Sequence, residues 1–568
     1  MNQFLSMSAF LPIADSPIFK VFIFGFYLFL CFNIISKNKA LSSKQEWLLL
    51  TCAIVWVLIY KWYPLLLNAP LNGDESLIYS NALTLLEIDP VPYRSVEFST
   101  LGPLQVISFI IPQFLGQEVS FNGFRWVWVV YLIISQVFIY LSLKNFFKEK
   151  PYFVYFLYPF ILASTTLVYD FNYFNNEATC LVFLSAGLYF FSKNFEALKH
   201  KDSYDFWAVF LLSLSVYGKP HAALIGIALS VLVFIQKYRS QGVFTAKYIL
   251  GFTFSGLIST ALIFSYFAYF GIFEDFWFFY ITTNLSYGTS ESFYNKFIRV
   301  FLTRSVSEHY INYYVKHFYF VLFAVNLILP VLIRKLDFRH IVGLVLSLVS
   351  IYSICLPGNI YGHYFTLLFL TFGYSIGNLD ALVRQLLPEK FKTTFSFSVL
   401  AVCVFLFYCS LKNQALYYTS KMDELFDKKV NTLVKAPLSK YLLNYATKKN
   451  LENPRMVIFD WRNEIHVETG FLQATHYNVP ERLFGNQAAK PKVVERVREL
   501  YLNDIKKSKP AFFLLATSTK YSYWDMTMTA LEQVPDLHKY VMEHYTSIKK
   551  IDDCDVFVRN DLNDASVL

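Results

Sequence analysis

The segment Leu71–Leu104 carries the residue types in this chain that are most able to do chemistry. Two adjacent acids, Asp74 and Glu75, follow an Asn-Gly turn, and further charges and prolines interrupt the segment. Each charge or freed backbone group inside a bilayer costs several kcal/mol, so this segment cannot cross a membrane although long apolar runs flank it. We interpret it as an active-site loop packed at a membrane surface. The other interrupting residues are Glu87, Asp89, Pro90, Pro92, Arg94, Glu97 and Pro103.

Asp74 and Glu75 allow two interpretations that do not exclude each other. Residues Ser76–Glu87 have helical apolar spacing, so Asp74 would cap a helix and Glu75 would lie in its first turn, where the helix dipole favours an acid. Alternatively, a half-buried carboxylate at the membrane surface acts as a general base on an acceptor hydroxyl or amine. A capping position is also a rigid one, so one residue can serve both purposes.

Glu177 is the second acid of interest. It follows Asn175-Asn176 and begins an apolar run on the same predicted side of the membrane as Asp74. It is either a helix-start carboxylate or a second carboxylate that orients the acceptor or helps to bind a divalent cation. One residue does not decide between these roles.

Basic residues occur at two predicted outer helix ends, in the runs 219–221 and 357–364. This placement opposes the usual excess of basic residues on the cytoplasmic side. An anionic ligand would explain it, and a lipid phosphate is the natural candidate; snorkelling side chains or a turn are the alternative. The residues assigned to the phosphate are Lys219, His363, Tyr364 and Arg94.

The composition indicates a polytopic α-helical membrane protein. Of the 568 residues, 55% are hydrophobic and only 16% are charged, and the mean hydropathy is +0.39, too apolar for a soluble globule. The net charge of +9 does not indicate nucleic-acid binding, because Lys and Arg lie mainly in short clusters between apolar runs. Seven cysteines without paired spacing argue against a disulfide framework or a zinc site.

The apolar runs predict about twelve membrane helices, at about 20 residues for each span. Alternate connections are rich in Lys and Arg, which places them in the cytoplasm and places the acidic segment and both termini outside. The pair 205–217 and 221–236 is short and interrupted, so it forms two spans, a re-entrant pair or one bent span. The predicted spans are 17–36, 47–67, 122–143, 152–169, 178–192, 205–217, 221–236, 248–270, 317–333, 341–356, 364–378 and 393–411.

The chain is expected to contain a membrane domain, residues 1–411, and a C-terminal extracytoplasmic α/β domain, residues 452–568. An amphipathic segment, 412–451, connects them. The membrane domain carries the outer catalytic loop 68–121 and an aromatic outer loop, 271–316, which we expect to form amphipathic helices at the interface. In the C-terminal domain β-like runs alternate with helical ones. The β-like runs are 456–459, 511–517 and 555–560, and the helical stretches are Val493–Lys507 and Ala530–His544.

These features resemble the bacterial GT-C membrane glycosyltransferases, relatives of protein O-mannosyltransferases and of the enzymes that add aminoarabinose to lipid A. The similar features are an acidic pair after an early membrane helix, a PYRS…GPL stretch, a basic turn between short helices and an HY motif before a late membrane helix. Two membrane helices precede the acidic loop here and the family usually has one, so we treat 17–36 as an added helix. The matching pieces are Gly73-Asp74-Glu75, Tyr79, Ala82, Pro92–Ser95, Gly102–Leu104, Lys219-Pro220 and Gly362–Tyr364 in the membrane domain, with Met456–Trp461, Thr469-Gly470, Lys509-Pro510 and Val556–Arg559 in the tail.

The resemblance implies an all-α polytopic membrane domain of the GT-C type, with a C-terminal extracytoplasmic α/β domain, in the inner (plasma) membrane. It implies a polyprenyl-phosphate-linked sugar donor among the membrane lipids, a glycan, lipid or protein acceptor outside, and inversion at the anomeric centre. Some of these enzymes use a divalent cation; because the sequence has no dense ligand cluster, we expect no metal. The implied roles are general base for Asp74, supporting carboxylates for Glu75 and Glu177, phosphate binding for Lys219, His363 and Arg94, and sugar or acceptor binding for Tyr79, Tyr93 and Tyr361.

Two other functions stay open, an O-antigen-type polysaccharide polymerase and a flippase or transporter of lipid-linked sugars. A polymerase would favour a large central outer loop rich in arginine, and 271–316 has few basic residues. A transporter would show charged or broken helices at mid-membrane and internal two-fold symmetry, and the sequence shows neither. Motifs of nucleotide-binding loops, zinc proteases and serine hydrolases do not occur in a workable context.

Overall fold

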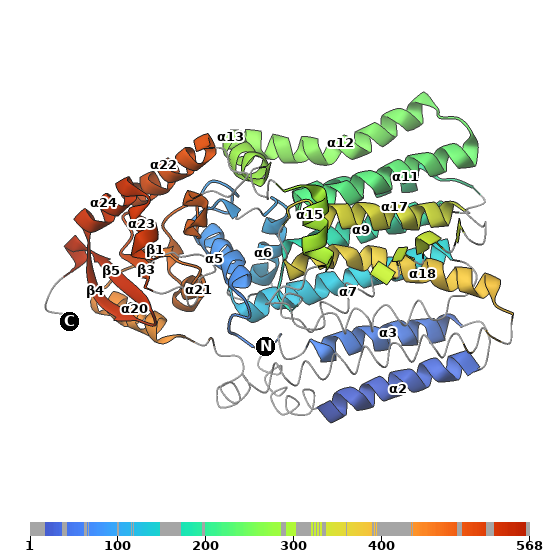
Figure 1. The fold of residues 1–568 in the computed structure, drawn as a ribbon, viewed down its shortest axis with the longest axis horizontal. Helices are drawn as coiled ribbons and strands as arrows, with labels where there is room; N and C mark the ends of the chain where they lie inside the picture. Colours follow the sequence, from blue (N-terminus) through green and yellow to red (C-terminus); the bar gives the residue numbers. More distant parts are fainter. Residues whose placement is uncertain are drawn as a thin grey trace. The chain divides into compact units, whose positions relative to one another are not determined.

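The computed structural model in Figure 1 describes residues 17–36, 42–147, 172–302, 320–394 and 433–563, apart from short gaps inside these ranges. The chain divides into two compact units. Unit 1 consists of residues 1–67, 128–261 and 293–430, and unit 2 of residues 68–127, 262–292 and 431–568. The acidic segment therefore belongs to the same unit as the C-terminal α/β domain.

Long apolar helices make up most of unit 1. Within the described ranges, five helical segments are long and apolar enough to cross a membrane: Phe121–Phe146, Pro220–Gln241, Ala246–Tyr269, Phe338–Cys355 and Gly362–Leu382. The helices α7 (Phe121–Phe146) and α12 (Ala246–Tyr269) contribute to both units. The other elements of unit 1 are α2 (Pro17–Ser36), α3 (Ser43–Tyr60), α9 (Asn176–Lys193), α10 (Asp202–Leu214), η4 (Ser215–Tyr217), η5 (Pro220–Ala222), α11 (Ala223–Gln241), α15 (Phe293–Phe297), η7 (Ile298–Leu302), α17 (Phe338–Cys355), η8 (Gly362–Leu367) and α18 (Leu368–Leu386).

The expected spans agree with these helices in most places. Helix α2 has the predicted bounds, and α3 is described from Ser43 to Tyr60, with Leu65 again helical; residues 62–64 and 66 lie outside the described residues. The span 152–169 and all of 393–411 except Thr394 lie outside the described residues, and 317–333 is described only in part, so the total of about twelve stays a prediction.

Helices α10 and α11 pack against each other and therefore do not form one bent span. Two glycines permit the close approach. A Cβ atom on Gly226 of α11 would lie 2.6 Å from the Leu212 carbonyl oxygen, and one on Gly187 of α9 would lie 2.6 Å from Leu212 Cδ2. The turn between α10 and α11 carries Lys219, so this packing fixes the position of that lysine within unit 1.

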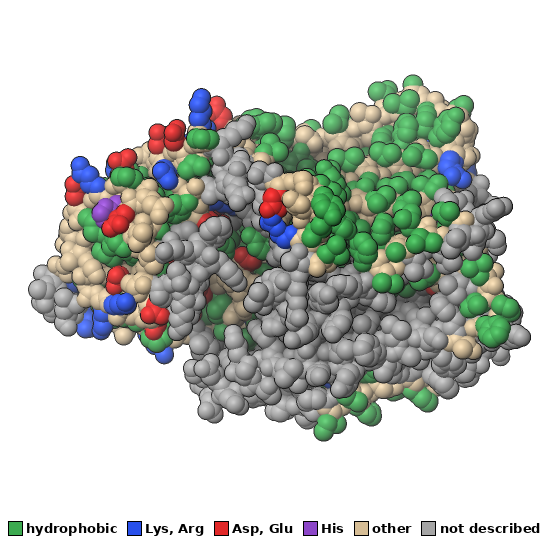
Figure 2. Space-filling model, viewed as in Figure 1, with side chains coloured by type: hydrophobic (Ala, Val, Ile, Leu, Met, Phe, Trp, Pro, Cys, Tyr) green, Lys and Arg blue, Asp and Glu red, His purple; other side chains and the backbone are tan. Residues whose placement is uncertain are grey.

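Large apolar side chains cover the outer surface of the long helices. Figure 2 shows hydrophobic side chains gathered over the region of α11, α12 and α17. Leu250 and Phe254 of α12 keep 70% and 64% of their surface exposed. Exposed apolar surface of this extent on a long helix is suited to lipid. The chain is thus a multi-pass membrane protein, as the composition predicts.

Unit 2 contains a five-stranded mixed sheet of order β2-β1-β3-β5-β4. Strands β2, β1 and β3 pair in parallel, and β5 pairs antiparallel with both β3 and β4. The three expected β-like runs coincide with β1, β3 and β5, whereas β2 and the polar edge strand β4 have no clear apolar pattern. The strands are β1 (Arg455–Phe459), β2 (Leu472–Gln473), β3 (Phe512–Ala516), β4 (Tyr545–Ile551) and β5 (Cys554–Arg559).

The helices of unit 2 come from three parts of the chain. The acidic segment forms α5 (Gly73–Ile88), and the following part of the outer loop 68–121 forms α6 (Gln105–Phe114). The described part of the aromatic loop begins with α13 (Phe273–Phe276), η6 (Trp277–Thr282) and α14 (Thr283–Leu285), short helical pieces as expected. The C-terminal domain contributes α20 (Pro437–Lys448), α21 (Glu464–Thr469), η9 (Pro480–Leu483), α22 (Pro491–Ser508), α23 (Met528–Glu532), α24 (Pro535–His544) and η10 (Asn560–Leu562).

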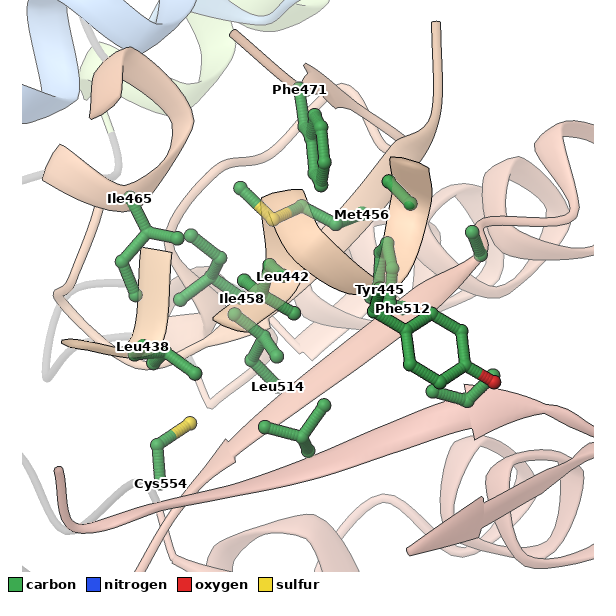
Figure 3. Packing of buried hydrophobic residues seen from close by; sticks show 14 residues of the cluster. Leu438, Leu442, Tyr445, Met456, Ile458, Ile465, Phe471, Phe512, Leu514 and Cys554 are labelled. Atoms are coloured by element: carbon green, nitrogen blue, oxygen red, sulfur yellow. The ribbon is translucent and has the colours of Figure 1, made fainter. Parts of the chain in front are cut away.

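One face of the sheet and helix α20 enclose the core of the C-terminal domain, shown in Figure 3. Leu438 and Leu442 of α20 belong to the same buried cluster as Ile458 of β1 and Leu514 of β3. Fully burying a side chain of this size stabilises the fold by about 1.5–3 kcal/mol. The domain thus has a core of its own, on which the polar segments between its strands can be positioned.

Candidate functional site

A buried ion pair anchors the start of α5. Glu75 and Arg125 are both 0% exposed, and Arg125 Nε and Nη2 donate to Glu75 Oε1 and Oε2 at 2.6 Å and 2.7 Å. The Tyr79 hydroxyl and the Leu71 amide donate to the same carboxylate at 3.0 Å and 2.9 Å. Arg125 also donates to the Ala69 carbonyl at 2.6 Å. A bidentate pair satisfied in this way is rigid, so it fixes the geometry around Asp74.

Asn72, rather than Asp74, caps α5. The Asn72 side chain accepts a hydrogen bond from the Asp74 amide at 2.6 Å, and Asp74 and Glu75 both lie in the first turn. Asp74 is half-buried, whereas Glu75 is fully buried. The interpretation of Asp74 as the capping residue is therefore wrong. A carboxylate in the first turn is favoured by the helix dipole, and it stays accessible to a reactant.

The C-terminal domain holds α5 through Gln473, at the end of β2, and Asn478, in the segment that follows. The Asn478 amide donates to the Leu77 carbonyl at 3.0 Å and to the Ser80 hydroxyl at 2.8 Å. The Gln473 backbone amide donates to the Thr84 hydroxyl at 3.0 Å. These atoms are buried, so each of the bonds would be costly to leave unmade. The acidic helix and the α/β domain form one structural piece.

His476 of the C-terminal domain binds the acidic segment near residues 94–97. Its carbonyl accepts from the Glu97 amide at 2.9 Å, its Nε2 lies 3.1 Å from the Arg94 carbonyl, and its Nδ1 lies 2.6 Å from Asp504 Oδ2. Both ring nitrogens thus face acceptors, which only the doubly protonated ring can serve. Burial alone lowers the pKa of His476, but the hydrogen bond to Asp504 and the charge of Asp504 outweigh it and raise the pKa above its usual value.

Three further predicted site residues belong to the framework of unit 2. Tyr93 is 0% exposed, has a φ of +69°, and donates to the Leu101 carbonyl at 2.8 Å. Arg94 is exposed and pairs with Asp89 at 2.7 Å. Tyr79 stacks on Phe124, with ring centroids 4.5 Å apart. Sugar or phosphate contacts for these three residues stay predictions, and their geometry favours a supporting role.

Unit 1 brings Glu177 together with the Lys219 ammonium group and the His221 imidazole at one end of its helices. Glu177 is 0% exposed, and Lys219 Nζ and His221 Nε2 lie 3.9 Å and 3.8 Å from its Oε1. Neither carboxylate oxygen of Glu177, nor His221 Nε2, has a hydrogen-bond partner in the described part of the chain. Buried polar atoms are normally bonded, so this loose arrangement indicates a site that a ligand or water completes.

The HY motif lies beside this group. The Tyr364 ring contacts His221, with centroids 4.9 Å apart, and Lys219 Nζ lies 5.7 Å from the centre of that ring. His363 stacks on Tyr361 at 5.5 Å and lies 3.5 Å from the Tyr173 hydroxyl. The Tyr361, His363 and Tyr364 rings pack on one another. Five predicted residues of unit 1 therefore form one cluster: Glu177, Lys219, Tyr361, His363 and Tyr364.

Sequence reasoning missed several residues of these sites. Lys61 is 1% exposed, donates to Asn172 at 2.6 Å and lies 4.9 Å from the centre of the Trp128 ring. Lys61 and Arg125 each stand in or beside an apolar run, which is itself a sign of function or of a buried partner. His221 is next to Lys219 and had no assigned role. No local pattern marks His476, because its partners are far away in the sequence.

One group in the described residues has the spacing of metal ligands, and it lies away from these sites. His200, Asp202 and Asp205 place their ligand atoms within 4.8 Å of one another. Asp205 accepts from Asn194 at 2.7 Å and from Tyr248 at 2.9 Å, and Lys237 pairs with Asp202 at 2.6 Å. Protein donors thus already engage both acids, which is typical of a structural network between helices.

A comparison with solved structures identifies the class of fold. The chain matches a crystal structure over 92% of its own length and 100% of the other chain, with a TM-score of 0.53 and 10% sequence identity. That structure is ArnT from Cupriavidus metallidurans bound to undecaprenyl phosphate. The apo structure of the same ArnT covers the same shares at a TM-score of 0.47 and 11% identity. No protein-family model and no curated protein matches the chain.

This likeness shows the fold alone, because the sequence identity is low. The expected resemblance to GT-C membrane glycosyltransferases is confirmed at that level, with a largely helical membrane part and a C-terminal mixed sheet.

The Glu75–Arg125 pair yields the first prediction. Glu75→Gln or Arg125→Met alone should lower the free energy of unfolding by about 3–5 kcal/mol, because each leaves a buried charge without its partner. The double variant should lose much less than the sum of the two single losses. Denaturation of the purified protein in detergent measures all four forms, and strictly additive losses would contradict the coupling.

His476 yields a second prediction, on pH. Because the folded protein holds its pKa above that of the unfolded chain, the contribution of His476 to stability is complete below about pH 6.5 and is lost as the pH rises through the folded-state pKa. The difference in thermal midpoint between wild type and His476→Gln should therefore shrink from about pH 6 to about pH 9. His544→Gln, at an exposed histidine of the same domain, is the control for the loss of an imidazole. A difference that grows with pH would be evidence against the doubly protonated ring.

Proposed function

We propose that this protein is an inverting membrane glycosyltransferase that moves a sugar from a polyprenyl-phosphate-linked donor to an extracytoplasmic acceptor. The observation that carries the proposal is the cluster of Lys219, His221 and Glu177, buried at one end of the membrane helices, in which the Glu177 carboxylate and His221 Nε2 have no hydrogen-bond partner among the described residues. The fold supports the same conclusion, since the crystal structure of ArnT that shares it contains undecaprenyl phosphate.

Lys219 and His221 suit the phosphate of the donor. Lys219 is 6% exposed, and a phosphate in reach of its ammonium group would gain a strong charge-assisted hydrogen bond in a poorly solvated place. His363 and Tyr364 pack directly beside these residues and can contribute further donors. Lys61 adds a second buried amine in unit 1, beside Asn172, the chain neighbour of Tyr173.

The reaction follows from a single displacement. The acceptor oxygen or nitrogen attacks the anomeric carbon, the bond from that carbon to the phosphate oxygen breaks, and the acceptor proton passes to Asp74 as general base. Polyprenyl phosphate leaves with the electron pair and with additional negative charge. Cations fixed near the leaving oxygen stabilise this charge as it develops, which lowers the barrier.

Within this proposal Glu75 and Glu177 position other residues and take no part in the proton transfer. Glu75 is engaged by Arg125, Tyr79 and Leu71, so it positions Asp74 and does not contact the reactants. Glu177 orients Lys219 and His221 and keeps the site from holding an excess of positive charge before the donor arrives. The active site and the C-terminal domain lie outside the inner membrane in this proposal.

Replacing Asp74 with asparagine tests the proposed base. Asp74→Asn should reduce sugar transfer from labelled polyprenyl-phosphate donors by about 10²–10⁴-fold, because it removes the proton acceptor. The thermal midpoint should change little, because Asn72 provides the cap of α5. Purified protein in lipid, offered a pool of donors, gives both readings.

The matched control is Glu87→Gln, at an exposed acid of the same helix. Full activity of Asp74→Asn would remove Asp74 from the chemistry. A wild-type protein that consumes no donor would favour the polymerase or flippase alternatives.

Replacing Lys219 tests the phosphate site separately. Lys219→Met should weaken the binding of polyprenyl phosphate about tenfold or more, the worth of one hydrogen bond to a charged group. The double variant with Glu177→Gln leaves no buried charge unbalanced, so it separates folding from binding. Native mass spectrometry in detergent measures the dissociation constants, with the exposed Lys247→Met as control. Unchanged binding in both variants would place the phosphate elsewhere.

A further inference from the structure

Three carboxylates from distant parts of the chain meet in unit 2. Gly73, next to Asp74, packs on Trp461 of the C-terminal domain so closely that a Cβ atom on it would lie 3.6 Å from the Trp461 ring. The Glu97 amide bonds to the carbonyl of His476, which precedes Tyr477. Burial raises the pKa of Glu481, Arg482 opposes this rise, and the negative charges of Asp74 and Glu97 add to it. The charges of Asp74 and Glu97 thus both act on Glu481.

The Tyr477 hydroxyl is evidence that a ligand binds near these acids. Tyr477 is 1% exposed, and its hydroxyl has no hydrogen-bond partner in the described ranges of the chain. Burial raises the pKa of Tyr477, and among the charges around it Glu97 adds most to the rise while Arg482 opposes it. A buried hydroxyl without a partner carries an unmet desolvation cost that a bound ligand would remove.

The arrangement suits a sugar better than a metal ion. The three carboxylates do not form a set with ligand atoms within 4.8 Å of one another, whereas the described residues 200–205 do contain such a set. Carboxylates spread more widely can each accept a hydrogen bond from a different hydroxyl of one ring. Trp461 is half-buried and adds an aromatic surface beside them.

We propose that Asp74, Glu97 and Glu481, with Trp461, Tyr477 and Arg482, form the binding site for the acceptor, and that the acceptor presents an uncharged, hydroxyl-bearing sugar there. The C-terminal domain then supplies half of the acceptor site. This inference rests on the proposed transferase function, because it makes Asp74 the group that meets the attacking hydroxyl.

The charge of the cluster excludes a phosphorylated group at this position. The charged groups near Tyr477 and Glu481 are Asp74, Glu97, Glu481 and Asp504 against Arg482, Arg496 and His476, so a phosphate or carboxylate would meet more negative than positive charge. Sugar hydroxyls, in contrast, donate to carboxylates and form charge-assisted hydrogen bonds. Unit 2 thereby offers acidic surroundings that suit a neutral sugar and disfavour an anionic group.

Binding of methyl glycosides to the full-length protein in lipid nanodiscs tests the site. Saturation-transfer NMR with a panel of neutral methyl hexosides, pentosides and deoxyhexosides should give signals for at least one of them, and its 6-phosphate or uronate counterpart should bind about tenfold more weakly or worse. Glu481→Gln should weaken binding of the neutral glycoside about tenfold.

Tyr477→Phe is the sharper variant, because it removes a hydroxyl that has no partner in the described part of the protein. Folding should be unaffected, while glycoside binding should weaken by about threefold to tenfold. The control Glu499→Gln removes an exposed acid of the same domain and should bind as wild type does.

Three results would overturn the inference. They are the absence of binding for every neutral glycoside, unchanged affinity in both Glu481→Gln and Tyr477→Phe, and tighter binding of the phosphorylated glycosides. A rise in the KM of the labelled donor without loss of glycoside affinity would likewise overturn it, since the acids would then hold the donor sugar.

Release of polyprenyl phosphate from the donor, measured in the same samples, keeps the two proposals apart. Wild-type protein that binds the glycosides and never consumes a donor would refute the transferase function and leave the sugar site standing. Wild-type protein that consumes donor, with variants indistinguishable in glycoside binding, would refute only the acceptor site.

Discussion

The buried pair of Glu75 and Arg125 is the interaction on which the acidic segment depends. Taking two charges out of water is favourable only if both are fully bonded, and here four hydrogen bonds end on one carboxylate. Breaking the pair would leave a buried charge without its partner, which is costly. The first turn of α5 therefore keeps its position as long as the pair is formed. Asp74 directly precedes Glu75, so the ion pair also fixes the position of Asp74. The first turn of α5 thereby has the rigidity that a general base requires.

The two buried acids of the candidate sites contrast in a way that separates structure from chemistry. Glu75 receives donors at 2.6–3.0 Å, whereas Glu177 has the nitrogens of His221 and Lys219 at 3.8 Å and 3.9 Å. Both are 0% exposed, so their difference is not one of burial. A carboxylate with all its hydrogen bonds made holds the fold, and a carboxylate with loosely placed neighbours leaves room for another group. The same residue type thus serves two purposes according to its partners.

Local patterns in the sequence predicted the helices and strands but not the long-range side-chain contacts between them. Apolar runs located α2, β1, β3, β5 and α22, because burial of a helix or strand leaves a mark within a few residues. The cluster of Glu177, Lys219 and His363 could be anticipated because each residue is conspicuous at a helix end. Arg125, His476 and Glu481 could not, since their partners at 75, 97 and 74 lie about 50 to 400 residues away. Tyr93 was assigned to the substrate, whereas tertiary packing buries it among aromatic rings.

The contacts within unit 2 also bear on what the C-terminal domain is for. A domain that only shielded the site could be joined to the acidic segment through its surface alone. Instead, Asn478 and Gln473 satisfy buried polar groups of α5, and the His476 carbonyl satisfies the Glu97 amide. Without the domain these groups would have to find water, and the face of α5 that carries Ser80 and Thr84 would be rebuilt. The sheet and its core therefore serve as the support of the acidic helix. The proposed general base owes its position as much to the C-terminal domain as to the helix that carries it.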